Sequence, residues 1–269
     1  VYSVSPKILG RGTFGSVREC THRESEVKYA VKSIDKSKVT RLNNIEREVQ
    51  LLKTVDHPNV VRMVDFFEDE DYVHIVTEIC TGGNLSDLLD DGTNGGCLSE
   101  DQAVIIVQSL LETVHYLHGN DIVHRDIKLE NLLFSVSEEG VILVKLIDFG
   151  LAVKHRVNDI KMTDTVGTLL YVSPEVVDGS YDRSCDVWAI GIVCYTLLCG
   201  YHPFDGDTRG EILDSICAAK FEFASPDWDS VSDTAKDFIC SLLVRDPSKR
   251  STIREALKSP WIGGCDDCM

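Results

Sequence analysis

The chain has 269 residues, of which 43% are hydrophobic and 26% are charged, and this composition predicts a globular protein with a sizeable core. Its 27 basic and 44 acidic residues give a formal net charge of −17, which argues against electrostatic binding to nucleic acid or anionic lipid. The longest nearly apolar run, residues 189–199, is too short to span a bilayer. We therefore expect neither a nucleic-acid partner nor a membrane span.

The pattern of apolar residues predicts two domains. In the first, short β-type runs cover residues 16–20, 29–34, 60–67 and 72–78, and a helical pattern covers 42–55. After the glycines at 82 and 83 the pattern turns helical, and Ser99 followed by Gln102 forms a capping box that opens a long helix. Further helices are predicted over 184–199, 207–219, 232–243 and 252–258. We therefore predict an α+β fold with a β-rich domain over residues 1–78 and a helical domain over 79–269.

Charge is distributed unevenly between these two parts. Residues 1–80 carry 12 basic and 13 acidic side chains, a net charge of −1, whereas residues 81–269 carry 15 and 31, a net charge of −16. A strong negative field of this kind attracts basic partners. The alternative is that the acidic residues only keep the protein soluble.

A glycine-rich segment near the N-terminus is the first motif that suggests chemistry. Gly10, Gly12 and Gly15 follow a G-x-G-x-x-G spacing, which lets the backbone approach phosphate groups closely. Residues 17–20 continue as a strand instead of opening a helix, so a dinucleotide-binding turn is excluded. The segment instead predicts a hairpin that covers a nucleotide.

Lys32 lies within an apolar β-type run. A buried lysine is unfavourable unless its ammonium group has partners, and Glu48 on the following helix is a candidate partner. The remaining donors of Lys32 would then be directed to phosphates. An edge-strand lysine that faces water is the alternative.

The most specific segment is His124-Arg125-Asp126-Ile127-Lys128-Leu129-Glu130-Asn131. It resembles the catalytic loop of the eukaryotic protein kinases, H-R-D-x-x-x-x-N. Asp148-Phe149-Gly150 follows at the usual distance in that family, and Ser173-Pro174-Glu175 stands where the family carries Ala-Pro-Glu. This resemblance extends from Gly10 to Trp261 and implies a bilobal protein kinase fold.

The resemblance implies a role for each matching residue. Asp126 would accept the proton of the substrate hydroxyl, Lys128 would contact the transferred phosphate, and Thr168 would hydrogen-bond to both. Lys32 would hold the α- and β-phosphates of ATP and pair with Glu48. Asn131 and Asp148 would ligate Mg²⁺, which favours hard oxygen ligands. A lysine two residues after the catalytic aspartate is typical of Ser/Thr kinases, so tyrosine specificity is not expected.

The resemblance also implies how ATP is bound. Gly10, Gly12 and Gly15 would cover the phosphates, and backbone groups of Glu78 and Cys80 would read the purine edge, with Thr77 as gatekeeper. The adenine pocket would be lined by Leu9, Val17, Ala30 and Leu133. Asn84 stands where family members often carry a glutamate that meets the ribose and a substrate arginine. Glu130 remains as the acidic residue for this purpose, and basic substrates are expected.

Several residues resemble structural features of the same family. Asp186 would fasten the backbone of the catalytic loop, and Arg250 would pair with Glu175 in a buried ion pair. Arg125 is of the type that meets an activation-loop phosphate, and Asp164 occupies the corresponding position with a ready negative charge. Phosphorylation of the neighbouring Thr163 or Thr165 is the rival explanation.

The ten cysteines show no disulfide framework, and the N-terminal residues lack a signal-peptide core, so a cytoplasmic protein with reduced thiols is expected. Cys265 and Cys268 have C-x-x-C spacing without a second ligand pair, which favours flexible thiols over a zinc site.

Segments at 56–61, 81–85, 198–204 and 246–250 resemble the calcium/calmodulin-regulated kinases, and most of all the calcium-dependent protein kinases of plants and protists. That resemblance implies calcium-linked signalling, with an autoinhibitory segment and a calcium sensor, either EF-hands or calmodulin, outside this chain. We therefore expect an excised catalytic domain. A pseudokinase scaffold is the alternative, but the joint presence of Lys32, Glu48, Asp126, Asn131 and Asp148 favours an active enzyme.

Overall fold

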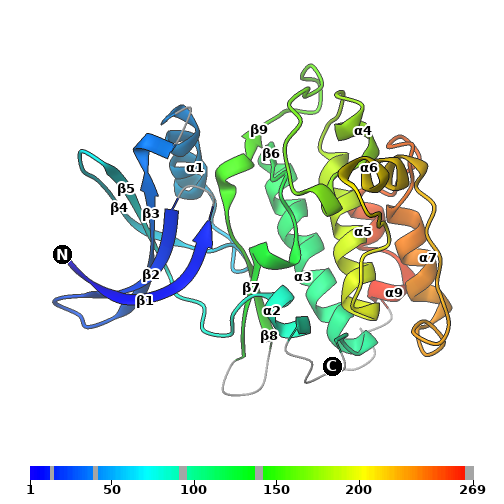
Figure 1. The fold of residues 1–269 in the computed structure, drawn as a ribbon, viewed down its shortest axis with the longest axis horizontal. Coiled ribbons are helices and arrows are strands. Elements are labelled where there is room, and N and C mark those ends of the chain that lie inside the picture. The colour runs from blue at the N-terminus through cyan, green and yellow to red at the C-terminus, as the bar shows by residue number, and fades with distance from the viewer. Residues whose placement is uncertain (13–14, 39–41, 91–95, 137–141, 264–269) are drawn as a thin grey trace. The chain divides into compact units, whose positions relative to one another are not determined.

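A computed structural model of the chain describes residues 1–12, 15–38, 42–90, 96–136 and 142–263. It divides into two compact units, Val1–Thr81 and Gly82–Met269, and the predicted boundary after residue 78 lies close to that division (Figure 1). The cysteine pair at 265 and 268 lies outside the described residues. Across the ranges just given, no helix is long and apolar enough to cross a membrane.

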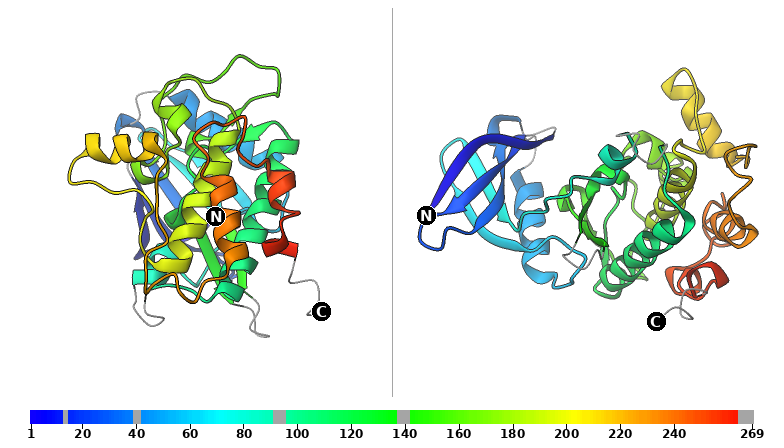
Figure 2. Two further views of the ribbon diagram at one scale, coloured as in Figure 1. Left: turned by 90° about the vertical axis from the view of Figure 1, so that its right-hand side faces the viewer. Right: turned by 90° about the horizontal axis from the view of Figure 1, so that it is seen from below.

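The first unit is built on a five-stranded antiparallel sheet in the order β1-β2-β3-β5-β4. Its strands are β1 (Tyr2–Gly12), β2 (Gly15–His22), β3 (Lys28–Asp35), β4 (Met63–Glu68) and β5 (Tyr72–Thr77). The helix α1 (Leu42–Thr54) lies along one face of the curled sheet (Figure 2). Its buried residues Ile45, Val49 and Leu52 recur at helical spacing, which explains why this segment forms a helix between strands.

In the first unit, two strands differ clearly from the sequence-based prediction. β4 begins at Met63 and not at residue 60, because the Val60 amide donates to the carbonyl of His57 in a turn. Val60 and Val61 are nevertheless buried, so their apolar character reflects packing outside the sheet. β1 was not predicted, since Pro6 interrupts its pattern. A proline is tolerated there because β1 is an edge strand whose register shifts between Val4 and Ile8.

The second unit is mainly helical. Its helices are α2 (Leu85–Asp90), α3 (Glu100–Gly119), α4 (Pro174–Val177), α5 (Ser184–Cys199), α6 (Arg209–Ala218), α7 (Asp233–Leu242), α8 (Ile253–Ala256) and α9 (Pro260–Gly263). Every residue from Cys185 to Leu198 is buried, so α5 is the central helix, and it lies beside α3 and α7 (Figure 1). The predicted capping box at Ser99 and Gln102 is present at the start of α3. The predicted α+β class is therefore confirmed.

Short elements position the loops that matter for function. β6 (Ile122–Val123) pairs with β9 (Val153–Lys154), and β7 (Leu132–Val136) pairs with β8 (Ile142–Leu146). The 3-10 turns η2 (Leu129–Asn131), η3 (Phe149–Leu151) and η4 (Leu169–Tyr171) lie in the loops around them, and η1 (Lys36–Lys38) follows β3 in the first unit. The catalytic-loop motif at 124–131 thus joins β6 to β7, and the Asp-Phe-Gly motif joins β8 to β9. Strands of two to five residues carry too little periodicity for prediction.

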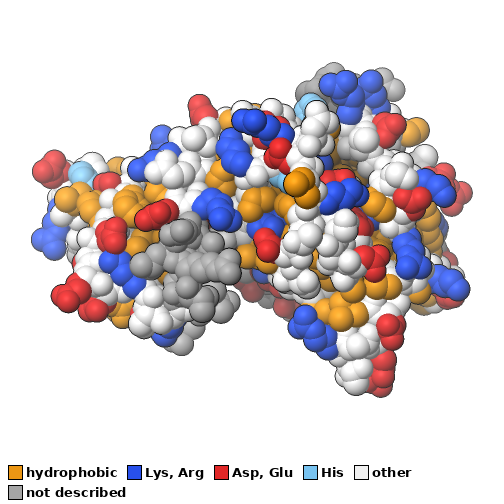
Figure 3. Space-filling model, turned by 90° about the horizontal axis from the view of Figure 1, so that it is seen from above, with side chains coloured by type: hydrophobic (Ala, Val, Ile, Leu, Met, Phe, Trp, Pro, Cys, Tyr) orange, Lys and Arg blue, Asp and Glu red, His pale blue; other side chains and the backbone are white. Residues whose placement is uncertain are grey.

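The excess of acidic residues in the second unit does not cover the face that Figure 3 displays uniformly. On the face that Figure 3 displays, acidic and basic side chains of this unit are interspersed with apolar ones. Any attraction of a basic partner to this face would therefore depend on local groups as well as on the net charge of −16 over residues 81–269.

Candidate active site

In the first unit, Lys32 and Glu48 form an ion pair. β3 carries the lysine and α1 carries the glutamate, and the Nζ atom lies 2.8 Å from Oε1. Glu48 is buried, so its carboxylate depends on such a charged partner. The pairing that the lysine-in-strand pattern suggested is therefore present.

The register of the sheet places four predicted site residues on one face. Val17 lies opposite Lys32 across β2 and β3, and Ala30 lies opposite Thr77 across β3 and β5. Residues 30 and 32 are two apart on the same strand, so they share a face, and directly paired residues share it with them. The apolar Val17 and Ala30 thus lie on the sheet face from which the Lys32 side chain extends.

The glycine-rich hairpin is formed by β1 and β2, with Gly10 opposite Val17 and Gly12 opposite Gly15. Thr13 and Phe14 lie outside the described residues, and Leu9 is exposed on β1, next to Gly10. A Cβ atom at Gly15 would come within 1.8 Å of the carbonyl oxygen of Ser33. Only glycine fits this close approach of two backbones.

The segment after β5 is fixed by hydrogen bonds to Arg62. The Glu78 amide donates to the Arg62 carbonyl (3.0 Å), and the Arg62 amide donates to Oε1 of Glu78 (2.8 Å). Cys80 is half-buried two residues further on. The chain around the predicted purine-reading residues therefore has a defined backbone.

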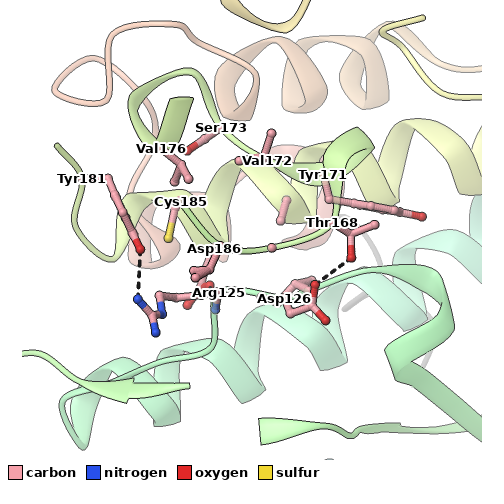
Figure 4. A pocket seen from close by; sticks show the side chains of 14 residues that line it. Arg125, Asp126, Thr168, Tyr171, Val172, Ser173, Val176, Tyr181, Cys185 and Asp186 are labelled. Atoms are coloured by element: carbon pink, nitrogen blue, oxygen red, sulfur yellow. Dashed lines mark hydrogen bonds between the residues drawn. The ribbon is translucent and has the colours of Figure 1, made fainter. Parts of the chain in front are cut away.

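In the second unit, the carboxylate of Asp126 is held by three side chains. Thr168 donates from Oγ1 to Oδ1 (2.8 Å), Lys128 Nζ lies 2.9 Å from Oδ2, and Asn131 donates from Nδ2 to Oδ2 (3.0 Å). Lys128 also donates to Thr168 Oγ1 (2.8 Å), which closes the network. Figure 4 shows the contact between Thr168 and Asp126.

Gly167 allows Thr168 to reach the catalytic loop. Its φ is +107°, in the region that favours glycine, and a Cβ there would lie 3.0 Å from the carbonyl oxygen of Arg125. Any other residue at position 167 would have a strained backbone, and its side chain would crowd the catalytic loop.

The backbone of the catalytic loop is fastened by Asp186, which α5 carries. Oδ1 accepts from the Arg125 amide (2.8 Å), and Oδ2 accepts from the His124 amide (3.0 Å) and lies 2.8 Å from His118 Nε2. Burial acts to raise the pKa of Asp186, but these hydrogen bonds and the nearby histidines outweigh it and hold the pKa below its ordinary value. A carboxylate stabilised in its charged form can keep Arg125 at its unusual φ of +67°.

The Asp-Phe-Gly segment packs against the same loop. Burial lowers the pKa of His124, and its ring meets that of Phe149 edge-on at 5.0 Å. The Ile147 amide donates to the Asn131 carbonyl (2.9 Å), which places Asn131 and Asp148 at the same end of the β7–β8 pair. Asp148 has a φ of +63°, and its Oδ1 accepts from the Gly150 amide (3.4 Å).

Two further predicted residues flank this loop. Leu133 lies on β7 and bridges to Asn84, and Glu130 is exposed at the end of the catalytic loop. Asn84 Oδ1 accepts from the Asp87 amide (2.9 Å) in the first turn of α2, and its Nδ2 donates to Asp87 Oδ2 (2.6 Å). The asparagine that replaces the expected glutamate therefore serves to cap a helix.

The activation segment, residues 151–172, also contacts the catalytic loop. Arg125 Nη1 lies 3.6 Å from Oδ2 of Asp164, and the arginine side chain is 5% exposed while that of Asp164 is 73% exposed. The predicted meeting of these two charges is present. Thr163 and Thr165, on either side, are both exposed.

The predicted ion pair between Glu175 and Arg250 is also present. Arg250 Nη2 donates to Oε2 of Glu175 (2.9 Å), and Nη1 donates to Oε1 (2.5 Å). Arg250 also donates to the carbonyl oxygens of Ser184 and Val244, and its guanidinium lies 5.1 Å over the ring of Trp188. This buried pair therefore joins the start of α4 to the loop before α8.

Comparison with known proteins agrees with these features. Residues 3–262 match the family described as Protein kinase domain, and the chain therefore belongs to that family.

Its relatives place it among the Ser/Thr kinases, and the resemblance to calcium-regulated kinases is confirmed. It is 40% identical over 97% of its length to Calcium-dependent protein kinase 3 of Plasmodium yoelii yoelii. It is 37% identical over 96% to Serine/threonine-protein kinase 33 of Bos taurus, and 36% identical over 97% to a probable myosin light chain kinase of Dictyostelium discoideum. It covers 48%, 54% and 66% of those three proteins, so it spans about half the length of the first two.

Two participants in this site were missed in the sequence. His118 lies on α3, where a histidine among apolar residues gives no sign that it meets Asp186. Tyr181 lies just before α5 and contacts Arg125 through its hydroxyl group. From the sequence, an aromatic residue near the start of a buried helix is expected to belong to the hydrophobic core. No local signal therefore indicated that Tyr181 contacts Arg125.

Proposed function

We propose that this chain is an active Ser/Thr protein kinase that transfers the γ-phosphate of ATP to hydroxyl groups of protein substrates. The observation that carries the proposal is the network in which Lys128, Thr168 and Asn131 hold the Asp126 carboxylate. Phosphoryl transfer depends on positioning and charge stabilisation more than on covalent chemistry. A carboxylate fixed beside a lysine provides both.

Asp126 is assigned to the incoming substrate hydroxyl. Its carboxylate orients the hydroxyl and accepts its proton as the oxygen attacks the γ-phosphate. Lys128 is assigned to the transferred phosphoryl group, whose oxygens carry negative charge in the transition state. Thr168 holds the two side chains together, since it contacts both within 2.8 Å.

Roles in ATP binding are assigned residue by residue from the family resemblance. Lys32, held by Glu48, is assigned to the α- and β-phosphates, and the backbone of Gly10, Gly12 and Gly15 to covering them. Backbone groups of Glu78 and Cys80 are assigned to the purine edge, Thr77 to the gatekeeper position and Glu130 to the ribose side.

The apolar lining of the adenine pocket is assigned to four residues, Leu9, Val17, Ala30 and Leu133. The shared sheet face of Val17, Ala30, Lys32 and Thr77 supports this assignment.

Asn131 and Asp148 are the residues that would hold Mg²⁺. Their side chains offer an amide oxygen and a carboxylate, and Mg²⁺ favours such hard oxygen ligands. The amide nitrogen of Asn131 is engaged by Asp126, which leaves its side-chain oxygen as the atom suited to a cation. When bound, the ion would neutralise charge on the phosphates.

Basic segments are the proposed substrates. The acidic excess of residues 81–269 and the exposed carboxylate of Glu130 support this choice. We expect peptides with Arg or Lys upstream of Ser/Thr to show kcat/KM values several-fold above those of matched acidic peptides. This preference should weaken as salt rises, because the screening length falls from about 10 Å at 0.1 M to about 3 Å at 1 M.

A positional peptide library assayed at two ionic strengths measures this preference. Glu130→Gln is the matched variant, since it removes one charge and keeps the shape of the side chain. Equal use of acidic and basic peptides at low salt would contradict the assignment of basic substrates.

We also propose that the enzyme needs no phosphate on its activation segment. The negative charge of Asp164 near Arg125 takes the place of a phosphate, with fewer acceptor oxygens. Protein treated with phosphatase should therefore stay active, and Asp164→Ala should lower kcat several-fold. Thr165→Ala serves as the control and should behave as wild type. Loss of activity after phosphatase treatment, or in Thr165→Ala, would show that a phosphothreonine is required instead.

Regulation by calcium is proposed for the whole protein. The name of the Plasmodium yoelii relative supports it, and the sensor, either EF-hands or calmodulin, would lie outside this chain with an autoinhibitory segment. A cytoplasmic location is part of the same proposal.

A pseudokinase that binds nucleotide without transferring phosphate is the second candidate. Incubation of the purified chain with Mg-ATP and a basic peptide separates the two, because only an active kinase releases ADP in step with phosphopeptide. Nucleotide binding without phosphopeptide would overturn the proposal of an active kinase.

A further inference from the structure

Tyr181 lies between α4 and α5 and is fully buried. Its hydroxyl accepts a hydrogen bond from Nη1 of Arg125 (2.9 Å) and donates one to the backbone carbonyl of Asp164 (2.9 Å). Figure 4 shows the ring directed at the guanidinium of Arg125, which precedes Asp126 in the catalytic loop. One hydroxyl group thus joins the catalytic loop to the activation segment.

The backbone of Tyr181 is attached to the same part of the activation segment. Its amide donates to the carbonyl of Met162 (3.0 Å), and the Met162 amide donates to the carbonyl of Tyr181 (2.8 Å). Residues 162–164 are therefore held by both the main chain and the side chain of one tyrosine. This gives the hydroxyl a fixed position relative to Arg125.

Within the described residues, the guanidinium of Arg125 contacts three oxygen groups, which differ in their exposure to water. Nε donates to the Leu151 carbonyl (2.8 Å), and Nη1 donates to Tyr181 and lies 3.6 Å from the Asp164 carboxylate. The carboxylate is largely exposed, so water and salt screen its attraction. Tyr181 is fully buried and the Arg125 side chain is only 5% exposed, so water can hardly replace this hydrogen bond to a charged donor when the hydroxyl is lost. The hydroxyl should therefore restrain Arg125 more strongly than the carboxylate does.

We propose that Tyr181 is a positioning residue through which the activation segment orders Arg125 and, next to it, Asp126. This inference rests on the proposed kinase function. Tyr181 supplies a permanent link that needs neither a phosphate nor an exposed ion pair. The Asp164 carboxylate adds a second contact with Arg125. The Tyr181 hydroxyl in turn fixes the position of Asp164, because it donates a hydrogen bond to the Asp164 carbonyl.

Tyr181→Phe removes the hydroxyl and keeps the buried ring. We expect kcat to fall about tenfold, since a hydrogen bond to a charged group is lost beside the catalytic aspartate, while KM for ATP stays unchanged. Tyr195→Phe is the matched control. Tyr195 is also buried, but its hydroxyl donates to the Glu222 carbonyl (2.7 Å) instead of bonding to Arg125. Tyr195→Phe should keep the wild-type kcat.

A double-mutant cycle with Arg125→Met tests the route of the effect. If the hydroxyl acts through the guanidinium, Tyr181→Phe should cause no further loss of kcat in the Arg125→Met background. The same fractional loss in both backgrounds would overturn the proposal, as would a Tyr181→Phe variant with kcat within about twofold of wild type.

Amide hydrogen exchange provides a readout that does not need turnover. Tyr181→Phe should speed exchange at the amides of residues 162–166, and Tyr195→Phe should not. Unchanged exchange at these amides would contradict the link. A wild-type chain without kinase activity would refute the proposed function, whereas this exchange measurement would still decide whether Tyr181 orders the activation segment.

Discussion

Replacing Asp126 with asparagine is expected to lower kcat by about 10²- to 10⁴-fold, the range that a positioned acid–base group contributes. The change keeps the shape of the side chain but removes the carboxylate to which we assign the substrate proton. Asparagine keeps one oxygen that can accept from Lys128 and Asn131, and its amide nitrogen can donate to the Thr168 hydroxyl, so fold and ATP affinity should be kept. Single-turnover kinetics measures the first effect, and calorimetric titration with ATP measures the second.

The control for this variant is Asp101→Asn, which makes the same chemical change at an exposed position in the first turn of α3. It should leave both kcat and ATP affinity unchanged. Near-native turnover in Asp126→Asn would show that the carboxylate does not act on the substrate hydroxyl.

Replacing Arg250 with methionine is expected to lower the free energy of unfolding by about 3–5 kcal/mol. The side chain of Arg250 is fully buried, and its loss leaves the Glu175 carboxylate in the interior without its partner. The carbonyl oxygens of Ser184 and Val244 would also lose their donor. Urea denaturation followed by tryptophan fluorescence reports on this event, because all three tryptophans, Trp188, Trp228 and Trp261, lie in the second unit.

Lys249→Met is the matched control, because it removes the neighbouring charge. Lys249 is 77% exposed and lies 3.6 Å from Asp246, so its loss should cost no more than about 1 kcal/mol. In the double variant Glu175→Gln/Arg250→Met part of the lost stability should return, since no unpaired charge remains buried. Equal stability of Arg250→Met and Lys249→Met would contradict this account of the ion pair.

Prediction from the sequence succeeded where a pattern was long or a partner was implied by chemistry. The helix over 184–199 was placed correctly because its residues are almost all apolar and buried. The pairing of Lys32 with Glu48 followed from the need of a buried lysine for a counter-charge. Asp126, Lys128 and Thr168 were grouped by resemblance to a family, since the threonine lies far along the chain and no local pattern connects it to the loop.

The features that escaped prediction depend on contacts between distant segments. β1 was hidden by Pro6, which is acceptable only because the strand has a free edge. His118 and Tyr181 look like ordinary helical or core residues in the sequence. His118 has its role because α5 brings Asp186 within hydrogen-bond distance of it. Tyr181 has its role because the chain before α5 pairs with Met162 of the activation segment.

The central claim is that this chain transfers phosphate to serine or threonine. It is tested most directly with γ-labelled ATP and one basic peptide that offers serine, threonine and tyrosine in equivalent positions. We predict label on serine and threonine when Mg²⁺ is present, no label on tyrosine, and almost none with Asp126→Asn. Label on tyrosine, or ATP binding by the wild-type chain without any labelled peptide, would contradict the account.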